Sequence, residues 1–246
     1  NDHIVREYER QAYVKKCLNL AVENDGVLMY LQPINDAHDG TLVGCEALAR
    51  IRDTDGELIY PDEFIPAAEE NGEIGALGEQ MFRKACEFMD SPVVRGSVLK
   101  WIGVNLAPIQ CMDESLADRY IEIFESYNLR PDTVCLGVTE QSLQDTAVLH
   151  ALIERLRHAG IPFILDNFGS SSSNIDRLKH NTFASVKLDR NAVWGHIDHP
   201  DPILPHVIKA CHEMGIDVIA EGVEDENMVT VLRKLGCDYF QGFYYS

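Results

Sequence analysis

Polar side chains that can bind metal ions or phosphate stand at or near the ends of several apolar, β-branched runs of the sequence. They are Glu46, Asn105, Asp166, Lys187, Glu221 and Gln241. Carboxylate and amide oxygens are the ligands that hard divalent cations such as Mg²⁺ and Mn²⁺ prefer in proteins. Two such ions can activate a water and neutralise the phosphate in phosphodiester hydrolysis. The residue types therefore predict a metal and phosphate site, provided that one fold brings them together.

An alternation of strand and helix patterns predicts such a fold. Apolar runs of strand length occupy residues 27–34, 43–51, 99–106, 133–138, 161–165, 184–188, 217–219 and 239–240, and segments of helical period lie between them at 77–89, 116–127, 147–158, 203–214 and 227–235. About eight strands in 246 residues indicate an α/β, TIM-barrel-like (β/α)₈ fold with a mostly parallel sheet. We expect a leading helix or linker at residues 1–25, a barrel at 26–246, and the site where the strands end.

Composition narrows the classes of partner. The formal net charge of -19 repels nucleic-acid backbones and argues against binding to duplex DNA or RNA. An anionic ligand would need bound cations or a local cluster of Lys and Arg, and the acidity could equally serve solubility alone. Seven cysteines without C-x-x-C spacing predict buried free thiols in a reducing cytosol, and they argue against a disulfide framework or a zinc site.

No targeting or membrane segment is evident in the sequence. No apolar run approaches the roughly 20 residues that span a bilayer, and no signal peptide is visible. The chain lacks an initiator Met and stops at Tyr244-Tyr245-Ser246, so we expect a fragment of a longer protein with an incomplete C-terminus. We expect a cytoplasmic location for the fragment, although the parent protein could be membrane-attached elsewhere.

A series of short motifs in fixed order resembles the EAL domain family, bacterial phosphodiesterases that act on the second messenger cyclic di-GMP. The motifs are Leu31-Gln32-Pro33-Ile34, Glu46-Ala47-Leu48 with Arg50, Pro61-x-x-Phe64-Ile65-Pro66, Val104-Asn105-Leu106, Val138-Thr139-Glu140, Asp166-x-Phe168-Gly169, Val186-Lys187-Leu188-Asp189, Ala220-Glu221-Gly222-Val223-Glu224 and Gln241-Gly242-Phe243. Each motif alone is weak, but their order and spacing are specific and cover nearly the whole chain.

The resemblance implies a role for each of the polar residues. One Mg²⁺ or Mn²⁺ would be held by Glu46, Asn105, Asp166 and the residue at 137, and a second by Asp166, Glu221 and the residue at 167. Lys187 would act on the attacking water, with Glu221 and Gln241 completing the catalytic group, and Gln32, Arg50 and Glu46 would face cyclic di-GMP. The family also implies a homodimer and further domains in the same polypeptide.

Six of these residues also have a purely structural explanation. Glu46 and Glu221 could be rim carboxylates paired to surface lysines, Asn105 and Asp166 could cap loops or turns, Arg50 could form a surface salt bridge, and Lys187 could be a buried ion-pair partner of Asp166 or Glu221. Their joint placement near strand ends favours a site.

Two positions depart from the family pattern. The family has Glu-x-Thr-Glu where this chain has Gly137-Val138-Thr139-Glu140, so a carboxylate that binds metal is absent. Glu140 cannot replace it, because an odd offset along a strand points to the opposite face, and its family counterpart supports a neighbouring loop. The family also has two consecutive aspartates where this chain has Asp166-Asn167, followed by an atypical run at Ser170–Ser173.

These departures predict a degenerate site. Glu46, Asp166 and Glu221 are three carboxylates where an intact site has five, so we expect little or no hydrolysis of cyclic di-GMP. Binding of the nucleotide needs stacking and phosphate contacts and can survive without metal. Two alternatives stay open: an active or slow phosphodiesterase that yields the linear dinucleotide, and an interaction scaffold that binds no nucleotide.

Overall fold

Eight strands close into a barrel in the computed structural model, which describes residues 2–142, 147–169, 178 and 183–245. The strands are β1 (Leu28–Asp36), β2 (Leu42–Arg52), β4 (Trp101–Asn105), β5 (Val134–Thr139), β6 (Phe163–Phe168), β7 (Ser185–Leu188), β8 (Asp217–Glu221) and β9 (Tyr239–Gln241). They follow the order β1-β9-β8-β7-β6-β5-β4-β2, and a further pairing of β1 with β2 closes the ring. The predicted (β/α)₈ fold is confirmed.

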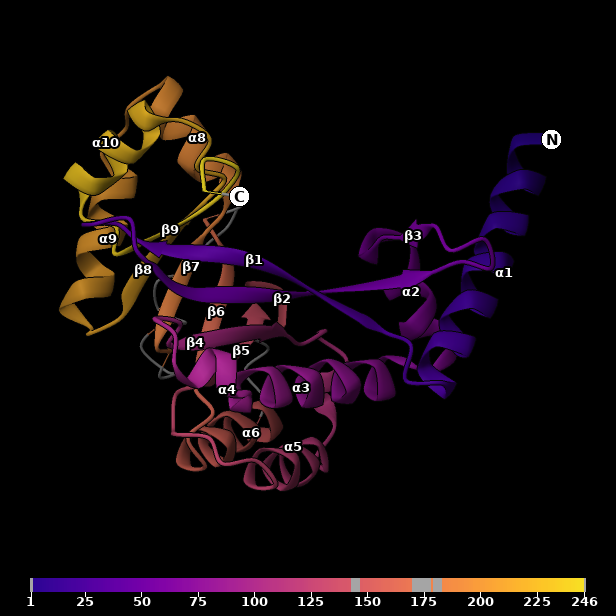
Figure 1. The fold of residues 1–246 in the computed structure, drawn as a ribbon. Helices are drawn as coiled ribbons and strands as arrows, with labels where there is room; N and C mark the ends of the chain where they lie inside the picture. Colours follow the sequence, from indigo (N-terminus) through magenta and orange to yellow (C-terminus); the bar gives the residue numbers. More distant parts are fainter. Residues whose placement is uncertain (1, 143–146, 170–177, 179–182, 246) are drawn as a thin grey trace.

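One strand of the ring runs against the others. β1 pairs antiparallel with both β2 and β9, whereas the pairs from β2 through β4 to β9 are parallel. Only residues 37–41 separate β1 from β2, which is too short a connection for the crossover that parallel neighbours need. The resulting hairpin is long and reaches beyond the barrel to α1 (Asp2–Glu23), α2 (Pro61–Asn71) and the two-residue strand β3 (Leu58–Ile59) (Figure 1).

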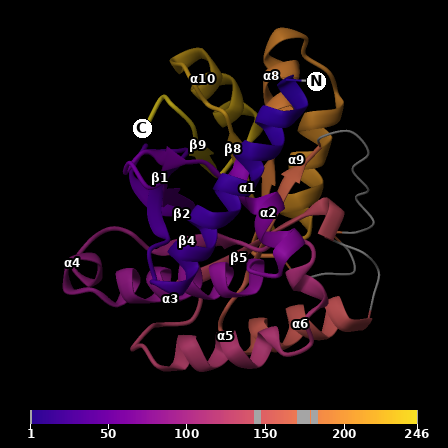
Figure 2. The same ribbon diagram turned by 90° about the vertical axis from the view of Figure 1, so that its right-hand side faces the viewer.

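The helices surround the barrel in two groups and extend it at one end. Their bounds are α1 (Asp2–Glu23), α2 (Pro61–Asn71), α3 (Ile74–Asp90), α4 (Pro92–Arg95), α5 (Leu116–Glu125), α6 (Ala147–His158), α8 (Arg190–Asp198), α9 (Ile203–Glu213) and α10 (Glu226–Leu235). In Figure 2, α3, α5 and α6 lie along one side and α8, α9 and α10 along the other. Within the described ranges, no helix is both long and apolar enough to cross a bilayer.

The sequence patterns did not single out α2 or α8 as helices. α2 contains Pro66, a residue that normally interrupts a helix, and begins with Pro61, which is tolerated at a first turn. α8 buries only Val193 and His196 and carries Gly195, so its apolar stripe is too narrow to stand out. Tertiary packing, rather than local preference, fixes both helices.

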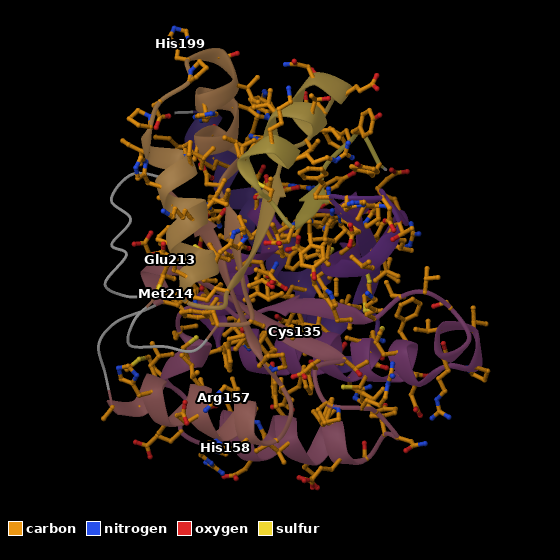
Figure 3. The ribbon with its side chains drawn as sticks, turned by 90° about the vertical axis from the view of Figure 1, so that its left-hand side faces the viewer. Cys135, Arg157, His158, His199, Glu213 and Met214 are labelled. Carbon is orange, nitrogen blue, oxygen red and sulfur yellow. The ribbon has the colours of Figure 1, made fainter. Side chains whose placement is uncertain are left out.

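Apolar side chains fill the half of the barrel away from the strand ends. Ile34, Cys135, Ile164 and Ile219 form a buried cluster there, with Trp101 packed against it. Figure 3 shows Cys135 among the interior side chains, with Arg157 and His158 on the outer side of α6. All seven cysteines are buried with free thiols, as the sequence predicted. The polar groups therefore gather at the opposite end, the mouth of the barrel.

A glycine makes room for the tryptophan of this apolar floor. A Cβ added at Gly44 would lie 2.5 Å from the Trp101 ring, so the indole occupies the space of a side chain on β2. The edge of Trp101 meets Tyr239 with their ring centroids 6.4 Å apart. The aromatic pair packs against the apolar cluster in the lower half of the barrel, beneath the polar layer.

Candidate active site at the barrel mouth

The carboxylate of Glu46 is the centre of the polar layer. Its Oε1 accepts a hydrogen bond from Asn105 Nδ2 at 2.7 Å. Its Oε2 accepts one from Lys187 Nζ at 2.9 Å and one from Gln241 Nε2 at 2.6 Å. Side chains from β4, β7 and β9 thus converge on one buried residue of β2. The expectation that the fold brings these residues together is met for this group.

The position of Glu46 within its strand differs from the expectation. The sequence suggested that Glu46 stands near a strand end, but it lies in the interior of β2, which continues to Arg52. Glu46 nevertheless lies level with the ends of the neighbouring strands. Ala47, the next residue, is the last of β2 to pair with β4, opposite Val104. β2 alone continues past this level because β1 and β3 pair with its outer part.

Lys187 carries the positive charge at the centre of the site. Its Nζ lies 3.5 Å from Asp166 in addition to its bond with Glu46, so the ammonium group bridges two buried carboxylates. Burial opposes the charge, but Glu46, Asp166 and Glu221 together raise the pKa of Lys187. Lys187 is therefore protonated at neutral pH, and its pairing with Asp166 matches the ion pair that the sequence left open as a structural explanation.

The carboxylates of the site respond differently to this charge. Burial alone would raise the pKa of Glu46, but Lys187 and the hydrogen bonds from Gln241 and Asn105 lower it. Burial raises the pKa of Asp166, and Lys187 offsets this only in part. Asp166 also accepts a hydrogen bond from the backbone N–H of Asn167 at 2.8 Å. Glu46 is thus the firmly ionised partner of the lysine.

Glu221 lies at the edge of this group. It ends β8 opposite Gln241 of β9 and is only partly buried. Burial raises the pKa of Glu221, and within the described part of the chain it forms no ion pair with Lys187, although its charge acts on the lysine. Within the described residues, the carboxylate of Glu221 forms no ion pair and lies beside the site.

The side chain of Asn105 occupies the space that a residue at position 137 would need. Gly137 pairs with Asn105 across β4 and β5, and a Cβ built on Gly137 would lie 2.4 Å from Asn105 Oδ1. A cavity of about 10 Å³ lies below, bordered by Glu46, Lys187 and both of these residues. That volume holds at most a single water. The Asn105 amide of the neighbouring strand thus fills the space beside Gly137.

Asn167 differs from the family aspartate in charge and has an unusual backbone. It adopts φ +56°, in the left-handed region that Asn tolerates better than most residues, and it is exposed.

Glu140 opens the 3₁₀ turn Glu140–Ser142 directly after β5. The loop at Ser170–Ser173 lies outside the described residues.

The residues present do not fit the two-metal centre that the family resemblance implies. Gly137 offers no donor, Asn167 offers a neutral oxygen, and the Lys187 ammonium lies between the two most buried carboxylates. Among the residues with described positions, no group of three His, Cys, Asp or Glu side chains is arranged to hold a metal ion. The remaining donors, Asn105, Glu46, Asp166 and Glu221, are tied into the lysine network or lie at its edge.

The predicted ligand-facing residues occupy two levels. Gln32 accepts a hydrogen bond from Gln241 Nε2 at 3.0 Å, which joins it to the central layer. Arg50 lies farther out on β2, between the rings of Tyr30 and Tyr60. These tyrosines lie outside the motifs that the sequence singled out. The alternation of β2, together with the hairpin pairing of residues 28–34 with 44–50, would have placed Tyr30 near Arg50.

Comparison with known proteins identifies a family over most of the chain. The model of the EAL domain matches residues 16–246. The chain is 30% identical over 226 residues to the probable cyclic di-GMP phosphodiesterase PdeB of Escherichia coli strain K12. This alignment covers 92% of the chain and 43% of PdeB. The chain is also 30% identical over 229 residues to the bifunctional diguanylate cyclase/cyclic di-GMP phosphodiesterase MucR of Pseudomonas aeruginosa, covering 92% of this chain and 33% of that one. The chain thus spans less than half the length of these relatives.

Solved structures agree with this result. The PaMucR phosphodiesterase in complex with cyclic di-GMP superposes with a TM-score of 0.86 at 28% identity, covering 95% of this chain and 96% of that one. The EAL domain of FimX from Pseudomonas aeruginosa bound to cyclic di-GMP gives a TM-score of 0.83 at 22% identity, covering 94% of each, a likeness of fold alone.

Proposed function

Because the chain belongs to the EAL domain family, we propose that it is a regulatory member of cyclic di-GMP signalling that binds the nucleotide and hydrolyses it little or not at all. Membership of the family, with relatives named as cyclic di-GMP phosphodiesterases, is the premise. The observation that carries the proposal is the replacement of a metal-binding carboxylate by Gly137, whose space the Asn105 amide fills.

The charge of the site supports the loss of hydrolysis. Glu46, Asp166 and Glu221 are the three carboxylates left to face up to four positive charges of two divalent ions, and Lys187 already neutralises part of theirs. Loss of even an outer hydrogen-bonding partner at a metal site typically costs about 10–100-fold in affinity or activity, so loss of two direct ligands should cost at least as much. Without bound metal, water keeps its pKa of about 15.7 and is a poor nucleophile at neutral pH.

Retention of nucleotide binding has separate support. Gln32 and Arg50 are both present at the mouth, and neither depends on a metal ion for its position. Fewer carboxylates also repel a dianionic ligand less when no metal is bound. The PaMucR phosphodiesterase, which shares this fold, has been solved in complex with cyclic di-GMP.

Two measurements on the same preparation test the proposal. Isothermal calorimetry with cyclic di-GMP in EDTA should show saturable binding, and incubation with Mn²⁺ or Mg²⁺ followed by chromatography should show no linear dinucleotide. Rapid appearance of the linear product would establish an active phosphodiesterase and overturn the proposal. Absence of binding heat at high micromolar ligand would favour the scaffold alternative.

We also place this domain in the cytoplasm, among other domains of a longer polypeptide. The relatives named above are more than twice as long as the aligned region, which supports the presence of other domains. A homodimer is the family expectation, and sedimentation velocity with and without cyclic di-GMP tests it.

A further inference from the structure

A cavity of about 350 Å³ lies at the end of the barrel opposite the mouth. Lys100 and Thr133 border it, and they stand immediately before the first residues of β4 and β5. Asn105, which belongs to the central site, is the last residue of β4, so the two sites lie at opposite ends of the same strand. Cavities that bind small molecules typically have volumes of about 300–1,000 Å³. The size of this cavity is therefore sufficient for a small ligand.

Positive charge gathers around this cavity. Arg95, Lys100 and Arg130 line it, and none of the described lining residues is acidic. The chain as a whole has 40 acidic and 21 basic side chains, so the lining runs against the composition. Arg95 forms an ion pair with Asp90. In the part of the chain that the structure describes, neither Lys100 nor Arg130 forms an ion pair, and both side chains are exposed at the rim.

Three carboxylates lie beyond these two cations. Asp36, Asp39 and Asp132 line a neighbouring cavity that Lys100 and Arg130 also border. An extended polyanion laid across both cavities would be repelled by these aspartates, whereas a small anion inside the first cavity would lie on the side of the cations. The distribution of charge therefore favours a small anionic ligand over a polymer.

The backbone that carries the two cations is held by hydrogen bonds. The Thr133 hydroxyl donates to the carbonyl of Arg130 at 2.7 Å, and the backbone N–H of Lys100 donates to the carbonyl of Val43 at 2.7 Å. Only the two side chains have to become ordered when an anion binds, which limits the entropic cost of binding.

Apolar side chains form the floor of the cavity. Met89 and Val94 are buried and belong to the main hydrophobic core, and Leu99 and Leu129 are half-buried beside them. Asn128 adds an amide group whose side chain forms no hydrogen bond to any other described residue. An apolar floor with a few polar groups at the rim suits a ligand that has an apolar body and one charged group.

We propose that this cavity binds a small organic phosphate, whose phosphate group contacts Lys100 and Arg130 and whose apolar body covers Leu99 and Leu129. A phosphate monoester carries about −1.5 to −2 charges at neutral pH, which matches two cations without ion-pair partners, whereas a carboxylate would match only one. The planar guanidinium group of Arg130 can donate two parallel hydrogen bonds to phosphate oxygens. The inference does not depend on the nucleotide binding proposed at the mouth.

Isothermal calorimetry with phenyl phosphate, in a buffer without divalent metal ions or cyclic di-GMP, tests the site on the full chain. The wild-type chain should bind this probe saturably at low millimolar concentration or below. Arg130→Gln and Lys100→Gln should each weaken binding about 10-fold, because each removes a charge-assisted hydrogen bond to the phosphate. Lys209→Gln is the matched control, since it removes the same charge from α9, outside the cavity.

Further arms separate the parts of the site and exclude the barrel mouth. Inorganic phosphate should bind more weakly than phenyl phosphate because it leaves the apolar floor uncovered, and phenol, which lacks the charge, should not bind detectably. Arg130→Lys keeps the charge but loses the planar fork, so it should weaken binding less than Arg130→Gln does. Arg50→Gln should leave the affinity for phenyl phosphate unchanged, because Arg50 lies on the outer part of β2 at the mouth.

Thermal melting of each variant checks that the fold is unchanged. The proposal is overturned if the wild-type chain gives no saturable heat with phenyl phosphate. It is equally overturned if Arg130→Gln and Lys100→Gln bind the probe as tightly as the wild type, or if Arg50→Gln alone weakens binding. Because no cyclic di-GMP is present in these measurements, their failure would leave the proposed function standing.

Discussion

The contact between Gly137 and Asn105 makes a prediction that can be worked out from the geometry. Gly137→Ala places a Cβ 2.4 Å from Asn105 Oδ1, so the amide must move. Its Nδ2 then loses the 2.7 Å hydrogen bond to the buried carboxylate of Glu46. A hydrogen bond to a charged group contributes about 1.5–3 kcal/mol, so we expect the free energy of unfolding to fall by about that amount.

The chain supplies a matched control on the adjoining strand. Gly103 also faces the barrel interior, and a Cβ there would lie no closer than 3.8 Å to Ile164, an ordinary contact. Gly103→Ala includes the same reduction in unfolded-state entropy, worth about 0.4–1 kcal/mol, without the clash. Urea denaturation followed by circular dichroism should therefore show a clear difference between the two variants.

A double-mutant cycle completes the assay. In the Asn105→Ala background the obstructing amide is gone, so Gly137→Ala should cost less than about 0.5 kcal/mol. The reasoning is refuted if Gly137→Ala and Gly103→Ala have equal effects. It is also refuted if the cost of Gly137→Ala persists without the Asn105 side chain.

Three further outcomes follow from the site and its surroundings. Gly137→Glu combined with Asn167→Asp should raise hydrolysis of cyclic di-GMP with Mn²⁺ at least 10-fold above either single variant, measured by chromatography of the linear product. Lys187→Met should lower the free energy of unfolding by about 3–5 kcal/mol in urea denaturation, because it leaves two buried carboxylates without their cation. The same change at the exposed Lys209 should leave the free energy of unfolding nearly unchanged. Ser115 and Arg119 lower the pKa of Asp113 from 3.8 to about 2. The stabilisation of the fold by the Asp113 carboxylate is therefore complete above pH 3.8 and is lost as the pH falls toward 2. In urea denaturation, Asp113→Asn should be less stable than the wild type at pH 7 and equal to it near pH 2.

The sequence predicted the barrel and the convergence of its polar residues because both depend on simple periodicity. The carboxyl ends of parallel strands lie at the same rim of a barrel, so polar residues that follow apolar runs must lie there too. Asn105 and Gln241 do end their strands, as this reasoning predicts. The interior position of Glu46 could not be predicted, because it depends on β1 and β3 extending β2 beyond its parallel neighbours.

Side-chain partnerships were the least predictable part of the site. The bridge from Lys187 to Glu46 joins residues 141 positions apart and depends on strand register and rotamer. The filling of the space at Gly137 by Asn105 likewise depends on the register of β4 against β5 and on the Asn105 rotamer, which the sequence does not indicate. Roles of the individual site residues remain predictions that the variants above test.

Trp101, seated in the space left by Gly44, packs against the apolar cluster that fills the barrel beneath Glu46 and Lys187. This apolar layer keeps the local dielectric low on one side of the lysine and its carboxylates, so their charges are screened less than charges in bulk water. A charged ligand at this mouth would therefore meet stronger fields from Glu46 and Lys187 than the same charges would produce in bulk water.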